Sequence, residues 1–202
     1  VSVPTQSILF NIDIEGPLTK DKTAVLRVFA KMFYNHCGFY GDDLKIAKLE
    51  RFIEKQGKTQ QFREAFEKVN GAPWTETRDS FAFFEDDIVS VLQSTLGMSE
   101  RAARNWFNGE ETNELSIAQL VADIQEYVDG KGKDFRLLFM VDEVGQYIGD
   151  DGDLMINLQS LVEEIGIRCH GKVWVMVTSQ EAIDSVVHIT GNDFSKILGR
   201  FN

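Results

Sequence analysis

The sequence predicts an α/β fold in which a parallel sheet carries a large helical insertion. Three apolar runs, at residues 7–13, 135–141 and 173–178, have the composition of strands. Helical periodicity fills the long stretch between the first two runs, and one helix separates the second from the third. Strands that alternate with crossover helices are typical of a parallel sheet. With 202 residues, 43% of them hydrophobic, the chain can form one large domain or two small ones.

The first strand is followed by a long series of helical segments. A loop through Gly16 and Pro17 leads into a predicted helix over about residues 21–34, which Gly38 ends. Pro73 is suited to the first turn of a later helix. The other amphipathic segments before residue 130 are residues 44–55, 60–69, 88–96, 100–107 and 117–128.

These helices are too numerous for a single crossover. We therefore predict that residues 1–41 and 130–202 form the sheet domain and that residues 42–129 form a compact helical insertion. The insertion should have its own small core and contain no strand pair. The large apolar residues expected in that core are Phe52, Phe62, Phe66, Trp74, Phe81, Phe84, Leu92 and Trp106.

The second strand is nearly continuous in apolar residues. Such a run is typical of a central parallel strand that helices cover on both faces. A helix over about residues 154–165 then leads to the third strand. Two short helical segments, at residues 181–187 and 193–198, are predicted after it.

Composition excludes several classes of protein. Asp and Glu outnumber Lys and Arg by 32 to 21, which gives a net charge of −11 and leaves no basic stripe for DNA. No apolar run approaches the roughly 18 residues of a membrane span, and no signal peptide is evident. Two cysteines are too few for a disulfide framework, so we expect reduced thiols and a cytoplasmic location. We also expect the chain to be an excised piece of a longer protein.

The strongest local signal lies at the end of the second strand. The apolar run of residues 137–141 is followed directly by Asp142 and Glu143. Ligands of open α/β sheets bind at the carboxyl ends of the strands. One carboxylate there can hold Mg²⁺ through water, and an adjacent one can activate an attacking water. This is the Walker B pattern of ATPases, although an ordinary strand that runs into an acidic loop has the same appearance.

The third strand ends in a second group of polar residues. Thr178 and Ser179 follow its last apolar residue, and the spacing from Asp142 leaves room for one crossover helix. In ATPases of this class, the strand beside Walker B ends in a polar residue that contacts the γ-phosphate or the attacking water. The alternative is that Thr178 and Ser179 only cap a following helix.

A phosphate-binding loop is missing from the sequence. No G-x-x-x-x-G-K-[ST] motif is present, and the Gly-Lys-Gly-Lys run at residues 130–133 precedes a strand rather than following one. The chain therefore has candidate magnesium and water ligands without a phosphate cradle.

The most distinctive segment of the sequence is Leu-Phe-Met-Val-Asp-Glu-Val-Gly-Gln-Tyr-Ile-Gly at residues 138–149. It resembles the Walker B region of one family, the large P-loop ATPases of BREX phage-defence systems of the BrxC/PglY type. Residues 153–159 and 173–181 resemble the helix and strand that follow Walker B in this family. Residues 10–13 and 38–42 resemble segments nearer the start, so the resemblance covers essentially the whole chain.

The resemblance implies specific roles for five residues. Asp142 would be the Mg²⁺-associated carboxylate, Glu143 would activate water, and Thr178 and Ser179 would lie at the sensor position near ATP. Arg200, in a Gly-Arg-Phe context, is similar to the arginine finger of AAA-type ATPases; the alternative is an ordinary surface arginine. The family's Walker A motif lies N-terminal to the part seen here.

The expected function is therefore that of a partial ATPase core from a large AAA-like protein of a bacterial BREX system. ATP and Mg²⁺ are the cofactors expected of the parent protein, and none is expected to bind this piece alone. The expected partners are other subunits of the same ATPase and other BREX proteins, with neither a membrane nor, for this segment, DNA. The alternative is an ATPase-derived interaction module that does not hydrolyse ATP and uses its helical insertion to bind partners.

The resemblance also predicts the strand order. P-loop NTPases of this class have the order 5-1-4-3-2, so the three predicted strands should form a parallel sheet in the order 4-3-2. The Walker B strand would be central, and strand 4 would have an open edge where strand 1 belongs. An open apolar edge can associate with another chain. We therefore expect the piece to self-associate through this edge or to cover it with its own terminal residues.

Overall fold

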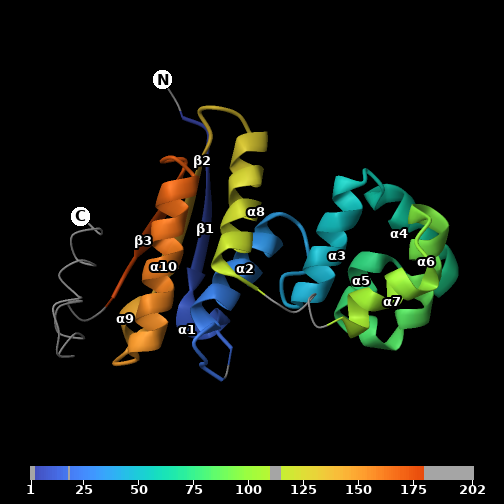
Figure 1. The fold of residues 1–202 in the computed structure, drawn as a ribbon, viewed down its shortest axis with the longest axis horizontal. Helices are drawn as coiled ribbons and strands as arrows, with labels where there is room; N and C mark the ends of the chain where they lie inside the picture. Colours follow the sequence, from blue (N-terminus) through green and yellow to red (C-terminus); the bar gives the residue numbers. More distant parts are fainter. Residues whose placement is uncertain (1–2, 18, 110–114, 180–202) are drawn as a thin grey trace. The chain divides into compact units, whose positions relative to one another are not determined.

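The computed structural model describes residues 3–17, 19–109 and 115–179 and shows an α/β chain (Figure 1). By its internal contacts the chain divides into two compact units. One comprises Val1–Met32 with Leu115–Asn202 and contains the sheet; the other is Phe33–Glu114. No helix among the described residues is long and apolar enough to cross a membrane.

The sheet has three parallel strands in the order β1-β2-β3. These are β1 (Thr5–Asn11), β2 (Arg136–Asp142) and β3 (Val173–Val177). The central position of β2 and the parallel pairing on both sides agree with the sequence prediction. β1 ends two residues before the predicted end, because the Asn11 side chain accepts hydrogen bonds from the backbone N–H groups of Asp13 and Ile14 and starts helix α1 (Ile12–Glu15).

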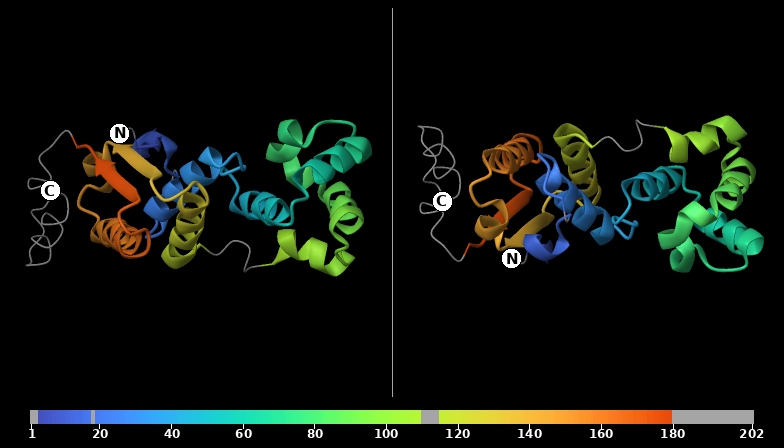
Figure 2. Two further views of the ribbon diagram at one scale, coloured as in Figure 1. Left: turned by 90° about the horizontal axis from the view of Figure 1, so that it is seen from above. Right: turned by 90° about the horizontal axis from the view of Figure 1, so that it is seen from below.

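One face of the sheet is buried beneath helices. The Phe29 ring of α2 (Ala24–His36) packs against Phe10 and Phe139, with centroids 5.5 and 5.3 Å apart. Helix α8 (Ile117–Gly130) also covers this face, where the Tyr127 hydroxyl donates to Gln6 Oε1 at 2.7 Å. Figure 2 shows α8 and α10 (Gly152–Arg168) on the same side of the sheet. The buried strand residues on this face are Ile8, Phe10, Leu137, Phe139, Val141 and Val173.

The opposite face corrects the prediction that helices cover β2 on both sides. There Leu9, Trp174 and Met176 are 68%, 61% and 54% exposed, and Leu138 and Met140 are half-buried. We call these five side chains the bare face, because none of the described elements covers them. The reason is topological. Both crossovers run in the same direction, from β1 to β2 and from β2 to β3, and right-handed crossovers then place their helices on one face.

The second unit is all-helical in its described residues, as predicted. It contains α3 (Leu44–Lys55), α4 (Thr59–Asn70), α5 (Trp74–Thr77), the 3₁₀ helix η1 (Arg78–Phe83), α6 (Glu85–Leu96) and α7 (Glu100–Asn108). Of the predicted core residues, Phe62, Phe66, Trp74 and Leu92 are buried, and Phe52, Phe81, Phe84 and Trp106 are partly buried against them.

The boundaries of this unit differ from the predicted 42–129. Residues 33–41 belong to it, whereas α8 belongs with the sheet and packs on α10. Helical periodicity identifies α8 as a helix but does not reveal which core its apolar stripe joins. In the structure the Tyr127 ring of α8 packs against Phe135, just before β2.

Candidate active site at the carboxyl edge of the sheet

The polar residues predicted for the site meet at the carboxyl ends of the strands. Asn11 and Asp142 are direct partners in the parallel register of β1 and β2. Thr178 follows β3 immediately, and its backbone continues the pairing. The Thr178 N–H donates to Val141 O at 2.9 Å, and Thr178 O accepts from the Val144 N–H at 3.1 Å. The end of β3 is thereby fixed beside the Asp142-Glu143 step.

Asp142 and Thr178 are in direct contact. The Thr178 hydroxyl donates a hydrogen bond to Asp142 Oδ1. The Glu143 backbone N–H points at the same two groups, 3.1 Å from Asp142 Oδ1 and 3.4 Å from Thr178 Oγ1. Asp142 Oδ1 is thus held in place, while Oδ2 accepts no hydrogen bond from the described residues. The Asp142 and Thr178 side chains are both exposed to solvent.

Glu143 has an unusual backbone conformation. Its φ of 62° and ψ of 29° lie in the left-handed region, which costs a residue with a Cβ roughly 1–2 kcal/mol. The residue occupies the N-cap position of helix α9 (Val144–Ile148) without a side-chain capping hydrogen bond, and its side chain is half-buried. Strained backbone of this kind is concentrated at functional sites, where the surrounding structure maintains it. Here the Asp142 and Thr178 oxygens stabilise it by accepting from the Glu143 N–H.

The other two predicted site residues, Ser179 and Arg200, are not among the residues of this hydrogen-bond network that the structure describes. The Ser179 hydroxyl oxygen is buried and has no hydrogen-bond partner among the described residues. Ser179 is next to Thr178 in the chain but does not join the Asp142 network. Arg200, the candidate arginine finger, lies outside the described residues, as do the predicted helical segments at residues 181–187 and 193–198.

Sequence reasoning missed the residues that hold the far end of α9. The Lys20 ammonium donates to Tyr147 O at 3.0 Å, lies 4.1 Å from the centroid of the Tyr147 ring and is 3.8 Å from Asp13 Oδ1. Tyr147 is buried, and burial, with Asp13 and Asp21 nearby, raises the pKa of its hydroxyl. Its ring packs on Gly16, where an added Cβ would lie 2.7 Å from Tyr147 Cε2. The glycine in the loop was the one sequence signal for this close approach.

The donor set partly fits a magnesium–nucleotide complex. The described residues contain no group of three His, Cys, Asp or Glu side chains that could enclose a metal ion. Mg²⁺ needs no such enclosure, because it keeps several waters and takes its other ligands from one or two carboxylates and the phosphates. Asp142 Oδ2 is available for this role, but no phosphate loop is present in the sequence. The residues therefore fit Mg²⁺ better than they fit the nucleotide itself.

No family model matches this sequence, and no solved structure matches it significantly.

Proposed function

We propose that this chain is the Walker B and sensor portion of a P-loop ATPase core, from a large AAA-like protein of a BREX defence system acting in the cytoplasm. The observation that carries the proposal is the contact of Thr178 with Asp142 across two adjacent parallel strands. It joins the polar end of one strand to the carboxylate of the next, at the edge where α/β sheets bind ligands.

The open parts of the sheet support this proposal. In the order 5-1-4-3-2, the strand that precedes the phosphate loop lies beside β3, which is unpaired on that side among the described residues. A crossover from that position back to β1 runs opposite to the two crossovers observed. By the handedness rule its helix lies on the other face of the sheet, which is the bare face. A strand–loop–helix segment from outside this sequence would cover both the open edge and the bare face.

Each site residue has a distinct role in this proposal. Asp142 would hold Mg²⁺ through its Oδ2 or a bound water, while Thr178 fixes the rotamer of the carboxylate through Oδ1. Glu143 would orient the attacking water and accept its proton. Lys20 and Gly16 would act indirectly, because they fix α9, the helix that begins directly after Glu143. Mg²⁺, when bound with ATP, would neutralise charge on the phosphates.

The test is ATP turnover by the complete parent protein. Glu143→Gln should retain nucleotide and lose at least 100-fold in turnover, because general-base catalysis is typically worth a factor of 10² to 10⁴. Thr178→Val should lower turnover less than Glu143→Gln does, because it removes the hydrogen bond that holds the Asp142 carboxylate but leaves the carboxylate itself in place. Asp134→Asn, which removes an exposed carboxylate outside the site, is the matched control. Unchanged turnover in Glu143→Gln would reject the catalytic assignment.

The second candidate is an interaction module that does not hydrolyse ATP. The observation that favours it is the separate core of the helical unit, which gives this part of the chain a rigid surface of its own. If Glu143→Gln is neutral while deletion of residues 42–109 abolishes the defence phenotype, this function is favoured over the ATPase.

A further inference from the structure

The helical unit contains a partly enclosed cavity that the ATPase proposal does not use. Its volume is about 120 Å³, and the buried side chains Phe39, Ile53, Phe62 and Trp74 form its apolar walls. Positions i, i+3 and i+4 of two helices contribute most of the lining. These residues are Glu50, Ile53 and Glu54 on α3 and Thr59, Phe62 and Arg63 on α4, with Cys37 and Gly38 completing the lining.

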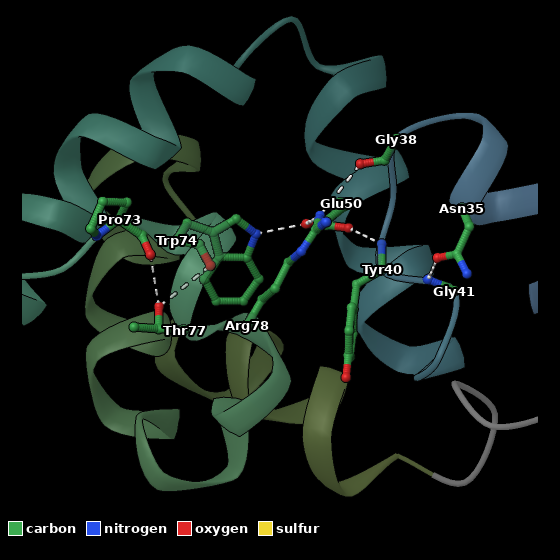
Figure 3. Close-up of polar contacts among 9 residues, drawn as sticks. All are labelled: Asn35, Gly38, Tyr40, Gly41, Glu50, Pro73, Trp74, Thr77 and Arg78. Carbon is green, nitrogen blue, oxygen red and sulfur yellow. Dashed lines mark hydrogen bonds and ion pairs between the residues drawn. The ribbon is translucent and has the colours of Figure 1, made fainter.

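The lining of the cavity includes a buried carboxylate, that of Glu50, which is only 8% exposed (Figure 3). Its Oε1 accepts from Trp74 Nε1 at 2.7 Å and from an Arg78 guanidinium nitrogen at 2.9 Å. Its Oε2 accepts from the Tyr40 N–H at 2.6 Å. A carboxylate has about four lone-pair positions, so three are used and one remains for a further donor. Glu50 can therefore accept a hydrogen bond from a ligand without losing its present partners.

The mouth of the cavity carries two charged side chains, Glu54 and Arg63. Neither the Glu54 carboxylate nor the Arg63 guanidinium forms an ion pair or hydrogen bond with any residue in the described part of the chain. Glu54 lies one helical turn beyond Glu50, so two carboxylates line the α3 side of the cavity. Arg63 stands on the α4 side and opposes the entry of a cation. The two residues thus give opposite, testable contributions to the charge preference of the site.

We propose that this cavity binds a primary ammonium group carried on a short alkyl stem. The aromatic walls suit both parts of such a ligand, because aromatic faces attract cations and bury methylene groups. The remaining acceptor position of Glu50 and the carboxylate of Glu54 supply the polar contacts. A guanidinium fits less well, since its planar fork needs a free bidentate carboxylate and Glu50 is already occupied by Arg78. The proposal is independent of the ATPase function.

The size of the cavity limits the ligand. An engineered apolar cavity of roughly 150 Å³ binds benzene, which has six heavy atoms. A volume of about 120 Å³ therefore suits n-butylammonium, which has five. Small ligands of this size gain at most about 1.5 kcal/mol per heavy atom and usually far less, so we expect a dissociation constant of roughly 1–10 mM. Two sources carry this chemistry: a free alkylamine and a lysine side chain of a protein partner.

The experiment is a ¹H–¹⁵N NMR titration of the full 202-residue chain with n-butylammonium. The Trp74 indole N–H resonance, assigned with Trp74→Phe, reports on the cavity because Trp74 lines it. The isosteres n-butanol and butyrate test the charge preference. We expect saturable shifts with the ammonium, weaker binding of the alcohol and none of the carboxylate. Equal binding of all three, or no saturable shift with the ammonium, would overturn the proposal.

Two surface variants sharpen the test, and neither touches the core of the unit. Glu54→Gln should weaken ammonium binding roughly two- to fivefold, the effect of losing an exposed ion pair. Arg63→Gln should strengthen it by a similar factor. Changes of the same sign in both variants would refute the charge argument. Nα-acetyl-lysine N-methylamide then distinguishes the sources: binding comparable to that of butylammonium indicates a lysine side chain, and loss of binding indicates a free amine.

Discussion

The buried carboxylate of Glu50 offers the most demanding test of how the helical unit is held together. In Figure 3 it lies between Trp74 on one side and the backbone of Tyr40 on the other, with Arg78 beside it. Glu50→Gln keeps the shape of the side chain and replaces one acceptor oxygen with an NH₂ donor. That group must face either the Trp74 and Arg78 donors or the Tyr40 N–H. The less costly orientation places the new NH₂ group toward Tyr40, where it opposes the Tyr40 N–H, so that one pair of donors is left without an acceptor.

The expected cost follows from the contacts that are lost. The Tyr40 N–H loses a hydrogen bond to a charged acceptor, worth about 1.5–3 kcal/mol. Arg78, whose side chain is 20% exposed, loses its ion-pair partner, although solvent access reduces that term to about 1 kcal/mol. We therefore expect a loss of roughly 3 kcal/mol in the free energy of unfolding. For a unit of this size, about 4–8 °C of melting temperature is lost per kcal/mol, so melting should fall by more than 10 °C.

Urea denaturation followed by tryptophan fluorescence measures this loss. Glu54→Gln is the matched control, because it makes the same chemical change one turn along α3 at an exposed carboxylate. It should alter stability by less than about 0.5 kcal/mol. Arg78→Met in the Glu50→Gln background should cost less than in the wild type, since the partner charge is already gone. If Glu50→Gln and Glu54→Gln have the same midpoint, the Glu50 contacts do not stabilise the unit.

Three further predictions concern the sheet unit. Gly16→Ala should destabilise it by about 1–3 kcal/mol, because the new Cβ would overlap the Tyr147 ring. Gly166→Ala should instead stabilise α10 by up to about 1 kcal/mol, because its Cβ would meet no neighbouring group within 4 Å. Shifts of opposite sign in the urea midpoints of the two variants would confirm both expectations. Burial raises the pKa of the Cys169 thiol to about 11, above its usual value of about 9, so the folded state retains a proton that the unfolded chain releases. Stability should consequently fall between pH 9 and 11 in the wild type and remain flatter in Cys169→Ala; parallel pH profiles would contradict this. The isolated chain should self-associate, because the bare face exposes large apolar side chains. Trp174→Lys, which places a charge on this face, should reduce the association measured by sedimentation. A wild-type chain that is monomeric at 100 µM would refute the expectation.

Local pattern alone determined much of this protein. Apolar runs located all three strands, and helical periodicity identified the segments that form α7 and α8. Asp142 and Glu143 were recognisable as candidates because they follow directly on an apolar strand, at the end where α/β sheets bind ligands. These signals are carried within a few neighbouring residues, so no knowledge of the fold was needed to find them.

Only the tertiary structure decided where those elements pack. The apolar run of β2 indicated cover on both faces, but the common direction of the two crossovers leaves Leu138 and Met140 on the face that no described helix covers. The hydrogen bond between Thr178 and Asp142 joins residues 36 positions apart. The Glu50 cluster likewise combines α3, α5, η1 and the loop before α3. Such contacts depend on which helices and strands pack against each other. Sequence periodicity cannot predict them, because it reports only the helix or strand to which a residue belongs.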